Sequence, residues 1–440
     1  IRLTLLGLKK VPIEVVEAGL MNGSSDKQIL FKVLVPTARR DILIGVNQVI
    51  MQCLAMAVIA SFIGAKGLGF NLLLALNQLR IGQALELGIC IVLIAVVLDK
   101  LSLAYANKQT DYFADLSFVK RHKYALVFAG FFMGCIALAL LGRFIFQDGI
   151  NYLYLIPHNK GITTELFWQS GVDWMIDNWY AGLQGFNRGL IVNVLQPMKN
   201  AYLAMPVSAT FLLVMGVGYI IGGIRSALIV GGLLLFIALT EWWDRALITM
   251  YMASFSVIIS VTIGLIIGSI CAQYTFASKA ALLACDTLQT FPSFIYLIPV
   301  IMLFGVTDTS VLIAVIIYAT IPAVRYTIEG IRNVPASLKE AGMMSGATAF
   351  QRWVSIDIPL AFPHIMLGVN QTVIFALFMV IIGAMIGTDD LGQYILKALS
   401  DKQGIGNGLM LGLCVAFIGL AVDHLINTWA AQRKNALGLS

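Results

Sequence analysis

Long apolar stretches alternate with short polar ones along almost the whole chain, which is the pattern of a protein that crosses a membrane many times. A helix rises about 1.5 Å per residue, so about 20 apolar residues cross a hydrocarbon core of roughly 30 Å. Apolar runs predict about ten crossings, near residues 41–63, 84–106, 124–146, 202–221, 226–240, 247–270, 291–305, 309–325, 363–387 and 408–428. The sequence therefore predicts an all-α polytopic membrane protein.

Two stretches modify this picture. The run 291–305 is short and contains Pro292 and Pro299, which predicts a broken or kinked span. Residues 147–200 mix Trp and Tyr residues with acidic ones. This mixture favours interfacial helices that lie on the external face over further crossings.

Composition agrees with a membrane protein and excludes several other classes. Hydrophobic residues make up 59% of the 440 positions and charged residues 12%, about half the charged share of soluble domains. The six cysteines stand singly, with no C-x-x-C pair, so neither a disulfide framework nor a zinc site is indicated. The net charge of +6 does not indicate nucleic-acid binding, because the cations cluster in short connections beside apolar runs.

The lysines and arginines also predict an orientation. If the cations near residues 9–40 lie inside, those near 120–123, 225, 279, 325–352 and 433–434 fall on the same side. Cytoplasmic loops carry an excess of Lys and Arg, so this side and the C-terminus are predicted to be cytoplasmic. The other side receives the loops near 64–83, 147–200, 241–246, 306–308 and 388–407.

An internal repeat divides the chain. Sixteen residues between Gly7 and Gly69 recur, without a gap, 323 positions later between Gly330 and Gly392. Such an array indicates a duplicated module. We therefore expect residues 1–106 to be the C-terminal part of a first module, 107–123 a linker and 124–440 a second, complete module. Because several spans precede only the second copy, we also expect about two hundred residues before Ile1 in the natural chain.

The repeat contains one polar segment that indicates a function. It reads VPIEVVEAGLMNGSS at 11–25 and VPASLKEAGMMSGAT at 334–348. Pro12 and Pro335 suit a helix start, and Gly23 and Gly346 suit a helix end. The helix between them is too short to span a bilayer and lies among cations, so we expect it to lie along the inner face.

A short helix held between two spans has the shape needed to insert into a groove of a soluble partner. Glu17 and Glu340 would provide a polar anchor, and small residues would permit close approach: Ala18, Gly19, Ala341 and Gly342. Force applied to such a helix would move the attached spans as rigid bodies. The simpler interpretation of the glutamates is the solvated face of a surface helix.

These residues resemble a known family. E-A-G-x-x-x-G followed by Pro36 or Pro359 is similar to the "EAA" coupling loop of type I permease subunits of ATP-binding-cassette importers. The segments DTLQTFPSFIYLIPVIMLFG at 286–305 and GVNQTV at 368–373, with Arg325, resemble permeases of glycine betaine, proline and choline uptake. The resemblance implies that a cytosolic ATPase dimer docks on the two coupling helices and that an external binding protein delivers the solute.

This chain departs from the family pattern at three positions. Val35 and Ile358 replace the usual Leu before the loop proline, which keeps an apolar contact there. The first copy has Arg40 where the second has Pro363, so we expect docking loops of different shape. The fusion of two modules in one chain would supply the pseudo-twofold pair.

Polar residues inside the predicted spans have two interpretations. Asn47, Gln48, Asn370 and Gln371 either pair neighbouring helices or line a translocation path. Phe291 and Pro292 either kink a helix or belong to a broken span that faces the path. Asp99 and Asp423 are interpreted as anchors or pair partners. Trp and Tyr residues such as Trp242 suit a membrane-interface belt, with a cage for a quaternary ammonium as the alternative.

No motif for catalysis is present. The chain lacks G-x-x-x-x-G-K-[ST] and H-E-x-x-H, and its four His residues are isolated. We therefore expect no enzymatic activity and no cofactor or metal on this chain, with ATP and Mg held by a partner ATPase. The prediction is a bacterial inner-membrane permease of an ATP-driven importer for a compatible solute such as betaine, proline, choline, carnitine or trimethylamine N-oxide.

Two other classes of function compete with this prediction. An ion-coupled secondary transporter of a small zwitterion also shows repeats and broken helices, but it needs buried ionisable groups at mid-membrane. A membrane sensor or scaffold that does not transport needs no duplicated cytoplasmic helix.

Overall fold

The fold is known from a computed structural model, which describes residues 2–9, 11–39, 42–43, 45–46, 49–50, 53, 56, 60–106, 123–145, 163–291, 293–384, 387–400 and 404–436. All regular secondary structure in these residues is helical, and they contain no strand. The predicted all-α class is confirmed.

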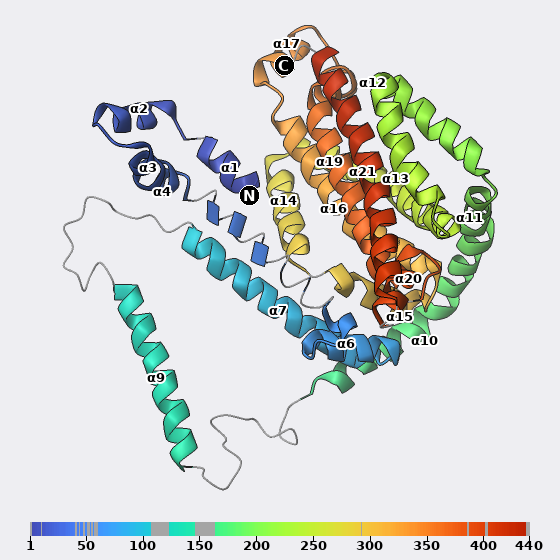
Figure 1. Ribbon diagram of the computed structural model, residues 1–440, viewed down its shortest axis with the longest axis horizontal. Helices are drawn as coiled ribbons and strands as arrows, with labels where there is room; N and C mark the ends of the chain where they lie inside the picture. Colours follow the sequence, from blue (N-terminus) through green and yellow to red (C-terminus); the bar gives the residue numbers. More distant parts are fainter. Residues whose placement is uncertain are drawn as a thin grey trace. The chain divides into compact units, whose positions relative to one another are not determined.

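The chain forms two compact units, drawn in Figure 1. The first unit comprises Ile1–Gly45 and Leu101–Phe167. Its helices are α1 (Arg2–Lys9), α2 (Ile13–Met21), α3 (Asp26–Gln28), the π-helix η1 (Ile29–Leu34), α4 (Val35–Thr37) and α9 (Lys123–Ile145). The predicted linker 107–123 lies, except for Lys123, outside the described residues.

The second unit comprises Val46–Lys100 and Trp168–Ser440. Its helices are η2 (Ala60–Ile63), α6 (Leu68–Asn77), α7 (Ile81–Ala106), α10 (Glu165–Leu190), the π-helix η4 (Ile191–Leu195), α11 (Gln196–Leu203), α12 (Val207–Ala238), α13 (Trp243–Gln273), α14 (Thr275–Thr290), η5 (Ser293–Tyr296), α15 (Leu297–Phe304), α16 (Asp308–Arg332), α17 (Ala336–Met344), α18 (Ala349–Arg352), the π-helix η6 (Trp353–Asp357), α19 (Ile358–Gly383), α20 (Leu391–Ser400) and α21 (Ile405–Ala436).

The core of the second unit is built around α16, which packs along α13 on one side and α19 on the other. Gly264 and Gly268 of α13 form a G-x-x-x-G pair, and Ala323 and Thr327 of α16 lie directly against them. Gly368 of α19 similarly faces Tyr326 of α16. Small residues let helix backbones approach closely where a hydrophobic driving force between helices is absent. The glycines therefore fix the positions of these three helices.

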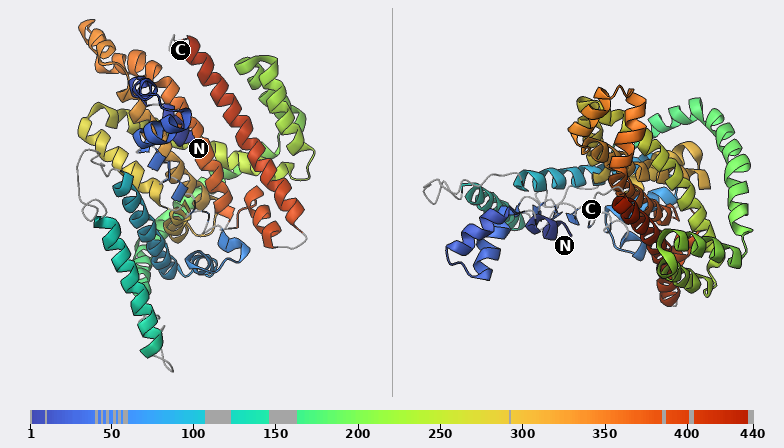
Figure 2. Two further views of the ribbon diagram at one scale, coloured as in Figure 1. Left: turned by 60° about the vertical axis from the view of Figure 1, so that its left-hand side comes forward. Right: turned by 90° about the horizontal axis from the view of Figure 1, so that it is seen from above.

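Helix α12 folds back on itself at Gly223, which has φ 68° and ψ −165°. A Cβ placed on Gly218 would lie 3.2 Å from the Cα of Ala227, whereas residues nine apart in a straight helix are separated by about 13 Å. The two limbs form the hairpin visible in Figure 2. They correspond to the runs 202–221 and 226–240, and glycine allows the turn because a left-handed φ is disfavoured for residues that have a Cβ.

The number of crossings is lower than predicted. Within the described residues, six helices are long and apolar enough to cross a membrane, or seven if one bent pair counts as a span. Five predicted runs match single helices: 84–106 (α7), 247–270 (α13), 309–325 (α16), 363–387 (α19) and 408–428 (α21).

The other predicted runs explain the shortfall. About half of the run 41–63 lies outside the described part of the chain, so no span can be assigned to it, and two runs share α12. The apolar part of α9 that the structure describes, Leu126–Leu141, is shorter than a span. The run 291–305 is only half of a pair, because α14 and the segment Ser293–Phe304 meet at an angle of 105°. The predicted break is present, although Pro292 itself lies outside the described residues.

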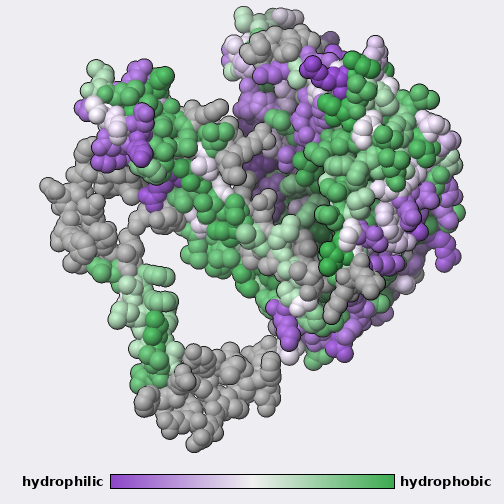
Figure 3. All heavy atoms as spheres, viewed as in Figure 1, coloured by the Kyte–Doolittle hydropathy of each residue, from purple (hydrophilic) through white to green (hydrophobic). Residues whose placement is uncertain are grey.

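The surface of the second unit follows its helices. Apolar side chains such as Leu212, Ile220, Ile258 and Ile266 are exposed on α12 and α13, and hydrophilic side chains gather over α10 and α11 (Figure 3). Residues 165–200 are helical, and their position along a membrane face stays a prediction.

Three π-helical turns each end two residues before a proline: Pro36 after η1, Pro197 after η4 and Pro359 after η6. A proline has no N–H, and its ring clashes with the carbonyl four residues earlier in an α-helix. The wider π turn moves that carbonyl aside. Two of these turns stand at equivalent positions of the repeat.

Candidate functional site

The two copies of the predicted coupling segment have the same backbone. Pro12 precedes α2 and Pro335 precedes α17, with nearly equal dihedral angles. Gly23 and Gly346 are left-handed, with φ 70° and 75°. Each helix ends with the same pair of hydrogen bonds: Gly23 N–H to Leu20 O and Ser24 N–H to Gly19 O in the first copy, and Gly346 N–H to Met343 O and Ala347 N–H to Gly342 O in the second. This is the Schellman arrangement, in which a left-handed residue lets the last carbonyls of a helix find donors.

The turn after each helix is also repeated. A capping box joins Ser25 with Gln28 in the first copy and Thr348 with Gln351 in the second. In such a box the side chains of the two residues satisfy each other's backbone N–H groups. The π turns η1 and η6 follow directly. The repeat that the sequence shows is therefore also a repeat of local structure.

The structure places the predicted coupling residues in two environments. Glu17, Ala18, Glu340 and Ala341 are exposed. Gly19 and Gly342 face inward, where a Cβ would lie 3.4 Å from Cγ2 of Val33 and 2.5 Å from Cδ1 of Ile356, respectively. The close approach that these glycines allow is therefore to the following π turn of the same copy.

Exposed apolar side chains accompany the glutamates. Met21 is 89% exposed and Met344, its equivalent, is 90% exposed. Leu20 and Met343 are also exposed at equivalent positions. Each copy thus presents a carboxylate and a pair of large apolar side chains on one short helix. Grouped exposed apolar side chains of this kind mark surfaces that bind a partner.

The residues predicted for the translocation path separate in the structure. Asn370 is 7% exposed, and its Nδ2 donates to Oδ1 of Asp423 at 2.6 Å, which joins α19 to α21. Asn370 and Asp423 therefore pair two helices. Gln371 is half-buried on another side of α19. Asn47, Gln48, Pro292 and the side chain of Asp99 lie outside the described residues.

Gln371 shares a helix face with an aromatic group that sequence reasoning missed. Phe375 stands one turn further along α19 and stacks on Tyr318 of α16, with ring centres 4.9 Å apart. Tyr318 also lies 5.5 Å from the ring of Tyr296, and Phe291 packs against the same core. These side chains gather at the break between α14 and α15. They, rather than Asn370, are the candidates for a path-facing wall.

An ion-pair network lies on the same face of α16, two turns from Tyr318. Arg325 Nη1 donates to Oδ1 of Asp286 at 2.6 Å and to Oε1 of Gln289 at 3.3 Å, and its Nε donates to Oε1 of Glu329 at 3.1 Å. Ionisable groups inside spans mark interiors or water-filled cavities. The i,i+4 spacing of Arg325 and Glu329 was a sequence signal for half of this network.

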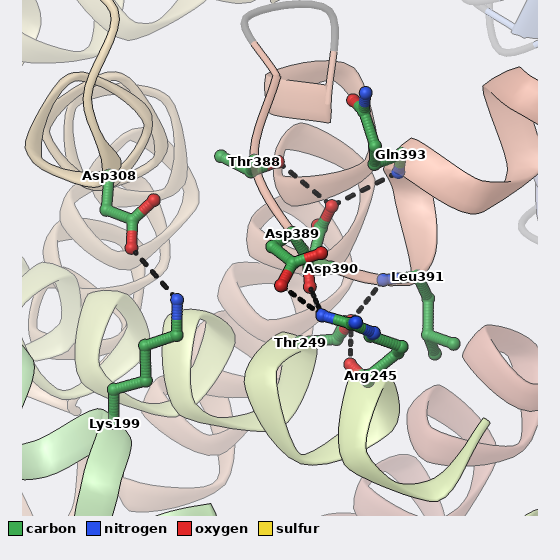
Figure 4. Close-up of polar contacts among 9 residues, drawn as sticks. All are labelled: Lys199, Arg245, Thr249, Asp308, Thr388, Asp389, Asp390, Leu391 and Gln393. Atoms are coloured by element: carbon green, nitrogen blue, oxygen red, sulfur yellow. Dashed lines mark hydrogen bonds and ion pairs between the residues drawn. The ribbon is translucent and has the colours of Figure 1, made fainter.

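Segments that the charge pattern assigns to the external side meet in a second polar cluster, shown in Figure 4. Lys199 Nζ lies 3.5 Å from Oδ2 of Asp308, which joins α11 to α16. Arg245 pairs with Asp389, which joins α13 to the turn before α20. These contacts connect four loops predicted to share one side: 147–200, 241–246, 306–308 and 388–407. The structure thus agrees that these loops lie together.

The buried side chain of Asp390 stabilises the same turn through hydrogen bonds. The residue is fully buried, and its Oδ1 accepts from Oγ1 of Thr388 at 2.9 Å and from the backbone N–H of Gln393 at 3.2 Å. It therefore caps α20. Burial raises the pKa of its carboxyl to about 6, opposed in part by these hydrogen bonds, while Asp308 adds to the rise. The repeat has Gly67 at this position in the first copy.

The aromatic alternative to an interface belt finds no support near Trp242. Its ring packs on Tyr394 with centres 4.9 Å apart, and the guanidinium of Arg245 and the ammonium of Lys397 already lie 5.0 Å and 4.8 Å from the Tyr394 ring. Two resident cations make this ring a poor place for a cationic ligand. Among the described residues, no group of three or more His, Cys, Asp or Glu side chains is arranged to hold a metal ion.

Comparison with known proteins identifies the family of the chain. Residues 1–107 and 264–434 match the family described as the inner membrane component of binding-protein-dependent transport systems. The chain belongs to this transport family. Each matched segment contains one copy of the repeat, so the family resemblance predicted from the coupling loops is confirmed. A polytopic membrane fold is the expected architecture of an inner membrane component.

Among its relatives in this family, the chain is 65% identical over 439 residues to the trimethylamine N-oxide transport system permease protein TmoV of Pelagibacter ubique, and 41% identical over 449 residues to that of Ruegeria pomeroyi. Both matches cover 100% of this chain, which spans 61% and 66% of the two relatives. It is also 31% identical over 271 residues to the glycine betaine/proline betaine permease protein ProW of Escherichia coli, covering 62% of this chain and 74% of that protein.

Proposed function

We propose that this chain is the membrane-spanning permease of an ATP-driven, binding-protein-dependent importer of a small methylated zwitterion, of the trimethylamine N-oxide and glycine betaine class. The observation that carries the proposal is the duplicated docking segment, with one backbone and the same exposed Glu and Met in both copies. The transport systems to which the relatives belong support the solute class.

The proposal assigns a partner to each end of the spans. A cytosolic ATPase dimer, which holds ATP and Mg, docks on α2 and α17. A soluble binding protein delivers the solute to the opposite side, near the turn that contains Asp389. Each partner favours one of two states of the permease, so ATP binding and solute delivery alternate access to the path. The chain itself carries out no catalytic step.

The location and the module boundaries belong to the same proposal. The chain lies in the bacterial inner membrane with its C-terminus in the cytoplasm. In support, Trp429 near the end of α21 packs edge-on against Phe362 at the start of α19, next to the segment that contains α17. Residues 1–106 are the end of a first module and 124–440 a second module.

Solute uptake by proteoliposomes tests the proposal. The permease is reconstituted with the ATPase subunit of its transport system, and labelled trimethylamine N-oxide and glycine betaine are supplied with the binding protein. We expect uptake only when ATP is present on the side of the membrane that carries the ATPase. This uptake should persist after the ion gradients across the membrane have been abolished. Uptake driven by a proton or sodium gradient without the ATPase would instead establish the secondary transporter.

A further inference from the structure

The second copy of the docking segment contains a lysine contact that has no equivalent in the first. Lys339 Nζ donates to the backbone oxygen of Ile331 at 2.8 Å and lies 3.6 Å from Oδ1 of Asp357. Ile331 lies in the last turn of α16, Lys339 in α17, and Asp357 at the end of the π turn that leads into α19. One side chain therefore joins the docking helix to two long helices.

The pair lies partly inside the protein. The side chain of Asp357 is 3% exposed and that of Lys339 28%. A buried carboxylate is costly unless it is paired, so this contact is more demanding than a surface ion pair. The neighbouring Glu340 is exposed, so adjacent residues of α17 serve two surfaces: one faces solvent and the other the joint with α16 and α19.

The end of α16, which precedes α17, is closely packed against the start of α19. Ile331 and Val334 are buried in one apolar cluster with Ala361 and Ile365 of α19. A Cβ on Gly330 of α16 would lie 2.9 Å from Cβ of His364 on α19, so the two helices are in backbone-level contact here. A displacement at this joint therefore acts on both helices as rigid bodies.

The first copy has no charged side chain at the two equivalent positions. Its residues at the positions of Lys339 and Asp357 are Val16 and Leu34. Val16 has no side-chain donor, so α2 cannot bind a carbonyl of α1 as α17 binds that of Ile331. Both positions change from apolar to charged together, as expected for two residues in contact.

We propose that Lys339 is a positioning residue that passes movement of α17 to α16 and α19 together. The inference rests on the proposed function, because α17 is driven only if an ATPase docks on it. Helices α16 and α19 carry Tyr318, Gln371 and Phe375, so the movement reaches the candidate path through two helices that pack along their length.

The test gives the second copy the residues of the first. The double variant Lys339→Val with Asp357→Leu has no unpaired buried charge, so α17 keeps its fold. We expect its affinity for the ATPase subunit of the transport system to stay within about twofold, and solute-stimulated ATP hydrolysis and uptake to fall about tenfold. Lys339→Arg keeps a donor and should retain most coupling. Lys279→Met removes an exposed lysine of α14 and serves as the matched control.

The outcomes separate the two proposals. Reduced coupling with unchanged ATPase binding supports the positioning role. Wild-type uptake per ATP in the double variant would overturn it, and so would loss of ATPase binding, which would show that Lys339 only maintains the docking surface. If the unmodified permease shows no ATP-driven uptake at all, the proposed function fails first.

Discussion

Residues 11–37 and 334–360 follow the same succession of proline, short helix, left-handed glycine, capped turn, π turn and proline, yet their buried contacts use different chemistry. The positions of Lys339 and Asp357, which form an ion pair in the second copy, are occupied by Val16 and Leu34 in the first. The exposed Met21 and Met344 are nevertheless identical. The duplication has retained the backbone and the exposed Glu and Met, while the residues at the Lys339 and Asp357 positions have diverged.

This comparison shows which residues set a local backbone. Proline at the start, glycine at the end and the capping box act within a few residues of one another, so they produce one shape in two different surroundings. Contacts between the helix and its neighbours can then vary, provided that each copy pairs an apolar with an apolar residue or a cation with a carboxylate.

The strongest test of the shared surface removes both carboxylates. In Glu17→Ala with Glu340→Ala, each docking contact loses about 2–5 kcal/mol if it is desolvated and hydrogen-bonded to the ATPase. We expect transport to fall at least tenfold, with the double variant worse than either single one. Co-purification of the ATPase and solute-stimulated ATP hydrolysis are the measurements.

The control for this test is Glu241→Ala, which removes an exposed carboxylate at the opposite end of the spans. Membrane insertion should be unaffected in every variant. Wild-type binding and hydrolysis in the double variant would show that both glutamates only face solvent.

The next test removes the ion pair of Lys339 and Asp357, which the first copy lacks. Lys339→Val alone leaves Asp357 buried without its cation, which costs about 3–5 kcal/mol. Asp357→Leu alone costs less, because the 28% exposed Lys339 can turn toward water. Thermal unfolding of the purified permease should rank Lys339→Val as the least stable, with the double replacement near the wild type. A double variant whose loss equals the sum of the two single losses would mean that the pair contributes no interaction.

A third prediction concerns the turn before α20, which is acidic only in the second copy. The pKa of Asp390 is about 6 in the folded protein, because burial raises it from the ordinary aspartate value of 3.8. The folded state therefore binds the proton more tightly, and stability falls as pH rises from about 4 to about 6 and is level above that range. The full difference is at most about 3 kcal/mol.

Asp390→Asn should remove this pH dependence while keeping an N-cap for α20. The midpoint of thermal unfolding, measured at pH 5 and pH 7, provides the readout. Relative to the variant, the wild type should have a higher unfolding midpoint at pH 5 than at pH 7. A constant difference at both values would mean that Asp390 does not titrate there.

The smallest expected effect tests the likeness of the copies. Gly23→Ala and Gly346→Ala each place a Cβ on a left-handed residue, and no other atom lies within 4 Å of that Cβ in either copy. Each should cost about 1 kcal/mol from backbone strain alone. Asn at the same positions should cost less, because it tolerates this conformation. Unequal losses for the two alanine variants in the unfolding midpoint would show that the backbones differ.

The sequence alone determined the helical class, the duplication and the ends of the docking helices. Apolar run length depends only on the thickness of the bilayer, and caps depend on residues within one turn. The sequence also predicted which loops lie together, since the contacts of Lys199 with Asp308 and of Arg245 with Asp389 join loops predicted to share a side.

Only the tertiary structure decided which face of each helix contacts which neighbour. Successive helical residues are rotated by about 100°, so Asn370 pairs with Asp423 while Gln371 lies on the helix face that also carries Phe375, and no composition rule separates the two. The fold-back of α12 at Gly223 and the inward turn of Lys339 depend likewise on partners far along the chain. Local chemistry set the elements, whereas packing against distant residues set which side chains meet.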